Sequence, residues 1–322
     1  MHIPDGFLDA KTAVASGVLA AAALGVAVRH AREHLTPRRV PLLGLAAAFV
    51  FAAQMINFPV AAGTSGHLVG AVLVAVLLGP SAALVVITSV LVVQCLMFAD
   101  GGVTALGANV LNMAVVGGAG GWVIYRAVCR AMTGLFGRIV AAAFAAWCST
   151  VLAAVACAGE LAASRTVAFP IVLPAMVGIH MLIGLGEGLI TALVLVAVAR
   201  TRPELVRPDP AGEAHRVDRA AIVYGAVIVL GLALFASPLA SRWPDGLERT
   251  AELLGFKARS SAPMLAAPIP DYAMPGVGRS VLATSIAGAT GTVVVFALSW
   301  WLARALVPRG TDAERRGSGE PG

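Results

Sequence analysis

The first two residues of the chain, Met1 and His2, offer an unusual set of metal-binding atoms. We expect Met1 to be retained, because a histidine in second place is too bulky for the usual aminopeptidase. The Met1 amine, the His2 amide and the His2 imidazole then lie within two residues, and once the amide is deprotonated they can close a five- and a six-membered chelate ring around one ion. Such a nitrogen set suits Ni(II), Cu(II) or Co(II) better than magnesium or calcium. Pro4 and the pair Asp5-Gly6 favour a turn, so the terminus can fold back on itself. The alternative is a frayed chain end without function.

His67 is the second residue with metal-binding chemistry. It follows a polar, glycine-flanked break, Gly63-Thr-Ser-Gly-His67, in which the backbone can approach other groups closely. One nitrogen from His67 would complete a four-nitrogen, roughly square-planar site with Met1 and His2, a geometry that favours Ni(II) or Cu(II) and tolerates Co(II). The alternative is that His67 merely caps a helix or fills a helix interface.

Composition indicates the setting in which these residues act. The chain is 59% hydrophobic and 12% charged, with a mean hydropathy of +0.87, which is typical of a polytopic membrane protein. The four cysteines form no CxxC pair and lie in or beside apolar segments, so we interpret them as small buried hydrophobes. The first apolar run is followed rather than preceded by arginines, so no cleavable signal peptide is expected.

Nine apolar runs predict an all-α protein with nine membrane-spanning helices. They cover residues 12–28, 41–60, 68–78, 82–99, 106–125, 139–158, 171–199, 220–236 and 280–306. The third run is short, so its helix could begin inside the polar break. A loop of about forty residues separates the last two helices, a polar linker occupies 201–219, and the tail beyond 308 is expected to be disordered.

The distribution of basic residues predicts the orientation. With the N-terminus outside and the C-terminus inside, most of the 23 Lys and Arg residues fall in the inner segments 29–39, 126–138, 200–219 and the tail. This accounts for the net charge of +6 without a nucleic-acid partner. It also places Met1, His2 and His67 on one face of the membrane.

Polar residues inside the predicted helices form a second set of candidates. Such residues rarely face lipid, and the simpler interpretation is that they hydrogen-bond neighbouring helices. The functional interpretation is that they orient His67 or the terminal segment; the candidates are Asn57, Asn109, Asn112 and His180. Glu187, seven residues after His180 and on the same helix face, could equally pair with a backbone group.

Three stretches carry a resemblance to a known family. MHIPDGFLD at the start, NFPVAAGTSGH (57–67) and IHMLIGLGEGLIT (179–191) resemble the substrate-binding component of the cobalt/nickel energy-coupling-factor (ECF) transporters, the CbiM/NikM family. The resemblance covers about residues 1–200. A shorter match, the PDGLE block at 244–248, resembles the small auxiliary CbiN/NikN component, fused in frame over residues 220–322.

The resemblance implies a seven-helix metal-binding component in 1–200, a cytoplasmic linker in 201–219 and two further helices in 220–322. It implies that Met1, His2 and His67 bind Co²⁺ or Ni²⁺ as the transported substrate, with no permanently bound cofactor. It also implies a location in the cell membrane and two kinds of partner, an ECF transmembrane coupling component and ABC-type ATPase subunits. Because the chain has no GxxxxGK[ST] loop, ATP hydrolysis must come from those partners. We expect few or no metal ligands from residues 220–322.

Two other functions were weighed. An intramembrane metal-dependent hydrolase could use His67, His180 and Glu187, but these three residues lack the paired-histidine i, i+4 spacing of such enzymes. A metal sensor would bind the ion without moving it. Transport is the favoured function, with no enzymatic activity, and the choice between nickel and cobalt stays open.

Overall fold

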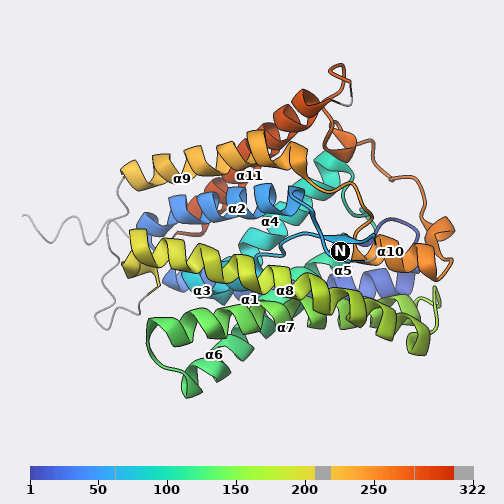
Figure 1. The fold of residues 1–322 in the computed structure, drawn as a ribbon, viewed down its shortest axis with the longest axis horizontal. Coiled ribbons are helices and arrows are strands. Elements are labelled where there is room, and N and C mark those ends of the chain that lie inside the picture. The colour runs from blue at the N-terminus through green and yellow to red at the C-terminus, as the bar shows by residue number, and fades with distance from the viewer. Residues whose placement is uncertain (62, 207–218, 279, 308–322) are drawn as a thin grey trace, which may run out of the picture.

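The computed structural model describes residues 1–322 except 62, 207–218, 279 and 308–322. It is almost entirely helical, and its long helices run roughly parallel or antiparallel to one another (Figure 1). Among the described residues, eight helical segments are long and apolar enough to cross a membrane. They are α1 (Ala10–His34), α2 (Val40–Met55) with the short turn before it, α4 (Pro80–Phe98), the continuous helix Leu106–Ala131, α7 (Gly134–Ala163), α8 (Phe169–Thr201), the segment Arg219–Leu239 and α11 (Val281–Leu306).

Two of these segments contain wider, π-helical turns. Leu106–Ala131 consists of α5 (Leu106–Val110), the π-helical η2 (Leu111–Gly120) and α6 (Gly121–Ala131). Arg219–Leu239 consists of α9 (Arg219–Gly231), the π-helical η4 (Leu232–Ala236) and η5 (Ser237–Leu239). Because a π turn changes which face a side chain occupies, π segments inside α-helices are frequent at functional sites.

The third predicted helix does not cross the membrane by itself. α3 covers only Ala71–Leu78, so the helix begins after the polar break and not within it. The described residues between α2 and α3 form no helix and contain a short antiparallel pair, β1 (Phe58–Pro59) and β2 (Ser65–Gly66), with Phe58 opposite Gly66. Non-helical backbone at membrane depth is tolerated where protein surrounds it.

The break and α3 together still carry the chain from one end of the bundle to the other. His67, at the start, lies beside Met1, whereas Leu77, near the end of α3, packs in the cluster that contains Cys129 and Val206. In the part of the chain that the structure describes, eight long helices and one half-helical crossing therefore stand in place of nine full helices. The parity of nine crossings is kept, and the N-outside orientation stays a prediction.

Close packing of small residues brings the long helices together. α7 and α8 run side by side through most of their length (Figure 1), and a Cβ on Gly188 of α8 would come within 2.8 Å of the Ala143 carbonyl of α7. α11 lies along α2 in the same way: a Cβ on Gly291 would overlap the Phe51 ring. Small residues at such positions let helix backbones approach in membranes, where hydrophobic burial gives little drive for association.

The C-terminal part packs against the first part in two places. α9 and α11 flank α2, whereas α10 (Gly246–Leu253), inside the predicted loop, lies at the end of the bundle where the N-terminus is found (Figure 1). Asp245 caps α10: its side chain accepts from the Leu247 and Glu248 amides, and the Glu248 carboxylate accepts from the Asp245 amide. The other short helices are η1 (Pro37–Arg39), η3 (Pro203–Leu205), η6 (Lys257–Arg259) and η7 (Pro270–Tyr272). Most of the predicted linker, and the predicted disordered tail beyond 308, lie outside the described residues.

Candidate metal centre

The N-terminal segment is buried in the protein. Met1 is 7% exposed, His2 is 9% exposed and the Ile3 side chain is fully enclosed. Phe7 packs edge-on against Phe256, with ring centroids 5.2 Å apart. The frayed end that the sequence left open as an alternative is therefore not what the structure shows.

One asparagine holds the Ile3 peptide on both sides. Asn109, on α5, accepts a hydrogen bond from the Ile3 amide at 2.8 Å and donates one to the Ile3 carbonyl at 3.1 Å. The Gly102 amide donates to the same carbonyl at 2.8 Å. A side-chain amide that pairs with a peptide in this way fixes the position of the two residues before it, Met1 and His2.

Asp5 fastens the turn that follows. Its carboxylate accepts from the Thr104 amide at 2.8 Å and from the Thr104 hydroxyl at 2.6 Å. Burial raises the pKa of the Asp5 carboxyl, but the hydrogen bonds from Thr104 outweigh it and the pKa lies below its usual range. A Cβ on Gly102 would lie 2.2 Å from the Asp5 nitrogen, so only glycine permits this approach.

The structure brings together the three residues predicted to bind metal. The Met1 nitrogen lies 2.7 Å from His67 Nε2, and the His2 and His67 rings stack with centroids 5.2 Å apart. His67 Nδ1 is 3.1 Å from the Leu68 carbonyl oxygen, which can only accept, so Nδ1 carries the hydrogen and Nε2 the lone pair. Nε2 is the atom that faces the terminal amine.

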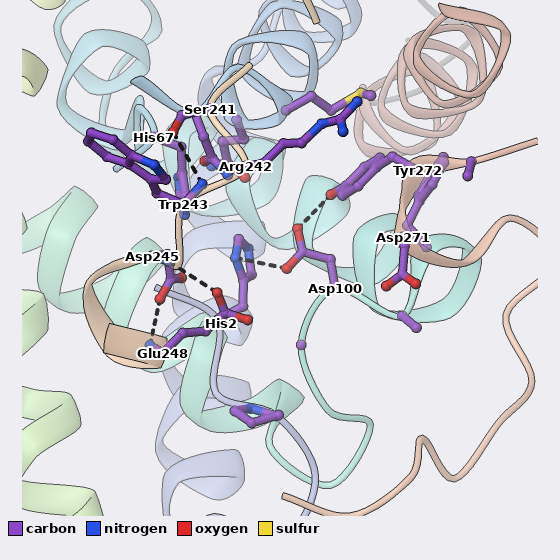
Figure 2. A pocket seen from close by; sticks show the side chains of 18 of the residues that line it. His2, His67, Asp100, Ser241, Arg242, Trp243, Asp245, Glu248, Asp271 and Tyr272 are labelled. Carbon is purple, nitrogen blue, oxygen red and sulfur yellow. Dashed lines mark hydrogen bonds and ion pairs between the residues drawn. The ribbon is translucent and has the colours of Figure 1, made fainter. Parts of the chain in front are cut away.

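His2 is oriented by two side chains on the opposite side of the ring. Nδ1 lies 3.2 Å from Asp100 Oδ1, and Nε2 lies 3.2 Å from Gln94 Oε1 (Figure 2 shows the contact with Asp100). Tyr272 in turn donates to Asp100 Oδ2 at 2.6 Å. Burial lowers the pKa of the His2 imidazole, although the Asp100 carboxylate acts in the opposite direction.

Asp245 of the C-terminal part reaches the same point. Its Oδ2 lies 3.0 Å from the Met1 nitrogen, and its side chain is 15% exposed. Burial raises the pKa of the Asp245 carboxyl, but the Met1 ammonium and the α10 backbone hold that pKa well below its usual range. We expected few or no metal ligands from residues 220–322, and the contact between Asp245 and the terminal amine brings a carboxylate of this part to the candidate metal centre.

Backbone contacts around His67 strengthen this connection. The Ser65 amide donates to the Pro244 carbonyl at 2.9 Å, and the Ser65 hydroxyl donates to the Trp243 carbonyl at 2.7 Å. Two segments that are almost 180 residues apart in the chain thus form one wall. A cavity of about 720 Å³ lies beside it, lined by His2, His67, Asp100, Asp245 and Glu248 among others (Figure 2).

Of the four residues expected to orient the site, only Asn109 contacts the terminal segment through a hydrogen bond among the described residues. Asn112, in the π-helical η2, donates instead to Glu160 of α7 at 2.6 Å. Asn57 lies beyond the end of α2, not on the helix as expected, and its carbonyl accepts from Ser241 of the C-terminal part at 2.7 Å.

His180 lies beneath the first residue of α10. Its Nδ1 is 2.7 Å from the Met176 carbonyl, and its buried Nε2 has no hydrogen-bond partner in the described part of the chain. A Cβ on Gly246 would come within 2.9 Å of this nitrogen. His180 therefore packs against the PDGLE segment rather than against His67.

Glu187 binds a backbone group, one of the two roles considered for it. Its carboxylate accepts from the Val69 amide at 2.6 Å and from the Gly70 amide at 2.9 Å. Gln54 donates to the Val69 carbonyl at 2.9 Å. The peptide that follows His67 is thus held by side chains of α8 and α2.

Three residues near the site were not selected from the sequence: Gln94, Asp100 and Asp245. Gln94 is a polar residue inside an apolar helix, the signal that selected the asparagines, and it could have been found in the same way. Asp100 and Asp245 precede glycines in turns, where aspartate is common for local reasons, so their position carries little functional information.

The geometry allows one small cation to be held by nitrogen. The terminal amine meets the His67 imidazole, the His2 ring stacks beside it, and carboxylates at Asp100 and Asp245 supply negative charge next to them. Nitrogen donors of this kind select late first-row divalent metals.

Comparisons with known proteins identify the family of the chain. The sequence model of the family CbiM, "Cobalt uptake substrate-specific transmembrane region", matches residues 2–205. The chain belongs to the CbiM family. A second model, the PDGLE domain, matches residues 219–307. The chain is thus a CbiM-family protein with a PDGLE part, as the sequence motifs indicated.

Fused relatives resemble the chain over nearly its whole length. It is 39% identical to the "putative fused nickel transport protein NikMN" of Archaeoglobus fulgidus, over 94% of this chain and 98% of the relative. It is 32% identical to the "fused nickel transport protein NikMN" of Rhodobacter capsulatus, over 92% and 95% of the two chains. These relatives are named as transport proteins and not as enzymes.

A solved structure resembles the first part of the fold. The crystal structure of a truncated transition metal transporter is 32% identical and superposes with a TM-score of 0.58, over 62% of this chain and 99% of that one. The protein is therefore an integral, multi-pass membrane protein of a metal-transport family.

Proposed function

We propose that this CbiM-family protein captures one Ni²⁺ or Co²⁺ ion at the outer face of the cell membrane and acts as the substrate-binding subunit of an ATP-driven ECF-type importer. The observation that carries the proposal is the 2.7 Å separation between the Met1 nitrogen and His67 Nε2, with the His2 ring stacked alongside. The names of the relatives, nickel and cobalt transport proteins, support this substrate class.

The ligands would be the Met1 amine, the His2 amide and imidazole, and His67 Nε2. A nearby negative charge favours this role: Asp245, 3.0 Å from the amine, can balance a bound cation in a site with little access to water. Asn109 orients the terminal segment through Ile3. Residues 1–200 would then carry the ligands, while residues 220–322 close the site.

Transport would require partner proteins that hydrolyse ATP and couple its hydrolysis to movement of the ion. The sequence contains no nucleotide-binding loop, so ABC-type ATPases and a transmembrane coupling subunit would supply the work. The α3 half-helix, with His67 before its first turn, resembles the broken helices on which membrane transporters build their midplane sites. A metal sensor would bind the ion equally well but would produce no uptake in cells that contain those partners.

The decisive experiment changes only the terminal amine. Two proteins are released from the same fusion by a protease, one beginning at Met1 and one with Gly-Pro before Met1, each with a non-histidine tag at the C-terminus. A single added glycine would not serve, because it would make His2 the third residue and create a new chelate of amine, amides and imidazole. The native protein should bind one tight equivalent of Ni²⁺ or Co²⁺ in equilibrium dialysis. The extended protein should lose this equivalent, as should His2→Ala, whereas His67→Ala keeps three of the four nitrogens and should bind the ion more weakly. Tight binding that persists in the extended protein would exclude the amine as a ligand.

Competition between Ni²⁺, Co²⁺ and Cu²⁺ for the native protein would identify the preferred ion. Uptake of that ion by cells, with and without an ATPase and coupling subunit of the ECF class, separates transport from sensing. Transport predicts uptake only with the partners present and only with an unmodified N-terminus. A sensor predicts binding without uptake in either case.

A further inference from the structure

Three metal-ligating side chains gather on the last two turns of α1, apart from the candidate metal centre. His30, Glu33 and His34 each offer a ligand atom, and these atoms lie within 4.8 Å of one another. Their spacing, i, i+3 and i+4, places them on one helix face. His30 and His34 have the i, i+4 spacing that lets two imidazoles on a helix share an ion, which His67 and His180 do not.

The local geometry prepares His34 for coordination. Its Nδ1 lies 2.9 Å from the His30 carbonyl oxygen, so Nδ1 carries the hydrogen and Nε2 keeps its lone pair. A backbone carbonyl that fixes the tautomer in this way is the usual companion of a metal-bound histidine. The two rings lie with centroids 4.1 Å apart, so both imidazoles are directed to the same side of the helix.

The competing interactions are weak. Arg29 Nε lies 3.8 Å from Glu33 Oε1, but the two side chains are 87% and 57% exposed. An exposed ion pair of this kind contributes little and is screened by salt. All three candidate ligands are exposed, so water can complete the coordination of an ion.

The cluster lies at the opposite end of α1 from the candidate metal centre. α1 starts at Ala10, directly after the buried terminal segment, and has 25 residues. At 1.5 Å per residue it spans about 37 Å, more than the hydrocarbon core of a membrane. The cluster therefore lies at the membrane face opposite the candidate metal centre.

We propose that His30, Glu33 and His34 form a second site for a divalent transition-metal ion, held by two imidazole nitrogens and one carboxylate oxygen. This donor set suits Ni²⁺, Co²⁺, Zn²⁺ or Cu²⁺ and not magnesium or calcium. Arg29 and Arg32 lie on the same turns and oppose a cation, so the site is weaker than the four-nitrogen centre. If the N-terminus is outside, as the proposed function has it, this site meets the ion on the side to which it is delivered.

The test uses the full-length protein with Gly-Pro before Met1, which removes the terminal chelate without making His2 the third residue, and a non-histidine tag at the C-terminus. This protein should retain one weak equivalent of Ni²⁺ in equilibrium dialysis. His34→Ala and His30→Ala should each weaken that binding at least tenfold, and Glu33→Gln should weaken it less. His215→Ala removes a histidine from the remainder of the chain and should leave the binding unchanged. Since the three residues are exposed, the variants should fold like the parent.

Cu²⁺ serves as a spectroscopic probe of the ligands. The electron paramagnetic resonance spectrum of one bound Cu²⁺ should show two coordinated imidazole nitrogens in the parent protein. It should show one coordinated imidazole nitrogen in His34→Ala. Weak binding that persists in the His30→Ala/His34→Ala double variant, or that is lost in His215→Ala, would overturn the proposal. Failure of the proposed function would give a different result. The N-terminally extended protein would then still bind one tight equivalent of Ni²⁺, and the substitutions at His30 and His34 would not change it.

Discussion

Glu187 Oε2 lies 2.6 Å from the Val69 amide nitrogen, two residues after His67. The second carboxylate oxygen accepts from the Gly70 amide, and the Gln54 side-chain amide donates to the Val69 carbonyl. Side chains of α8 and α2 therefore bind the polar groups of the backbone after His67. Glu187 is fully buried. The side chain that fixes the backbone after His67 thus comes from α8, 118 residues after Val69 in the chain.

We expect Glu187→Gln to weaken Ni²⁺ binding about 10- to 100-fold, the range for a residue that orients a metal ligand. A glutamine can accept only one of the two amide hydrogens and turns its own NH₂ group toward the other. Isothermal titration would measure the effect in the native protein and in His67→Ala. If Glu187 acts through His67, its replacement has no further effect once His67 is gone.

Glu160→Gln is the matched control. Glu160 is also a buried glutamate in a membrane helix with two side-chain hydrogen bonds, from Ser16 and Asn112, but it has no bond to the His67 loop. Its replacement should leave the affinity within a few-fold. If Glu187→Gln cannot be purified, Gln54→Met tests the same peptide through Val69. Equal effects in the native and His67→Ala backgrounds would show a general loss of structure instead.

Hydropathy could predict the long helices, because each must satisfy its own backbone and cross the same thickness of lipid. It could not predict the break before α3. The amides of Val69 and Gly70 are satisfied by Glu187, and that pairing exists only once α8 is packed against the loop. Hydropathy also misplaced Asn57. α2 ends at Met55, so Asn57 precedes β1, the strand of Phe58 and Pro59 that pairs with β2.

The site was predictable in part for a related reason. Met1, His2 and His67 could be chosen because nitrogen ligands have recognisable chemistry, and Asn109 because amides are rare among apolar helix residues. Asp245 could not be chosen, since a PDGLE turn explains its own aspartate as a helix cap. Its second role depends on contact between the two parts of the chain.

Asp245→Asn tests that second role. Asparagine keeps the cap of α10 but removes the negative charge 3.0 Å from the Met1 nitrogen. We expect metal affinity to fall at least tenfold while the thermal unfolding temperature changes little. Glu248→Gln, in the same capping box, keeps a hydrogen-bonding side chain and serves as the control for damage to α10. An unchanged affinity in Asp245→Asn would show that the carboxylate does not support the site.

Gly102→Ala should displace the terminal segment while the bundle stays folded. The new Cβ would lie 2.2 Å from the Asp5 nitrogen, a backbone atom that can move only with the whole segment. We expect the tight equivalent of Ni²⁺ to be lost or weakened by more than tenfold in dialysis. Gly159→Ala adds the same methyl group to α7 where no other atom lies within 4 Å, and should bind like the native protein.

Reporters of membrane sidedness test the predicted orientation. An enzyme reporter fused after Arg219 should be active in the cytoplasm, whereas one inserted between residues 260 and 268 should be active outside. The first site follows the linker and the second lies in the long connection between α10 and α11. A reporter after Arg219 that is active outside would reverse the orientation of the whole bundle and place the candidate metal centre on the inner face.

The anchoring of the terminal segment should weaken in acid. The pKa of Asp5 lies below its usual range because of the hydrogen bonds from Thr104, so this carboxylate stabilises the folded state fully above about pH 4, the ordinary pKa of aspartate. The contribution is lost as the pH falls through the lower pKa of the docked carboxylate. We therefore expect Asp5→Asn to unfold a few degrees below the native protein at pH 6, and the difference to shrink below pH 4. Thr201→Ala, whose hydroxyl donates to backbone carbonyls and to no carboxylate, should show no such pH dependence. A difference that stays constant from pH 6 to pH 3 would mean that Asp5 acts through its shape and not through its charge.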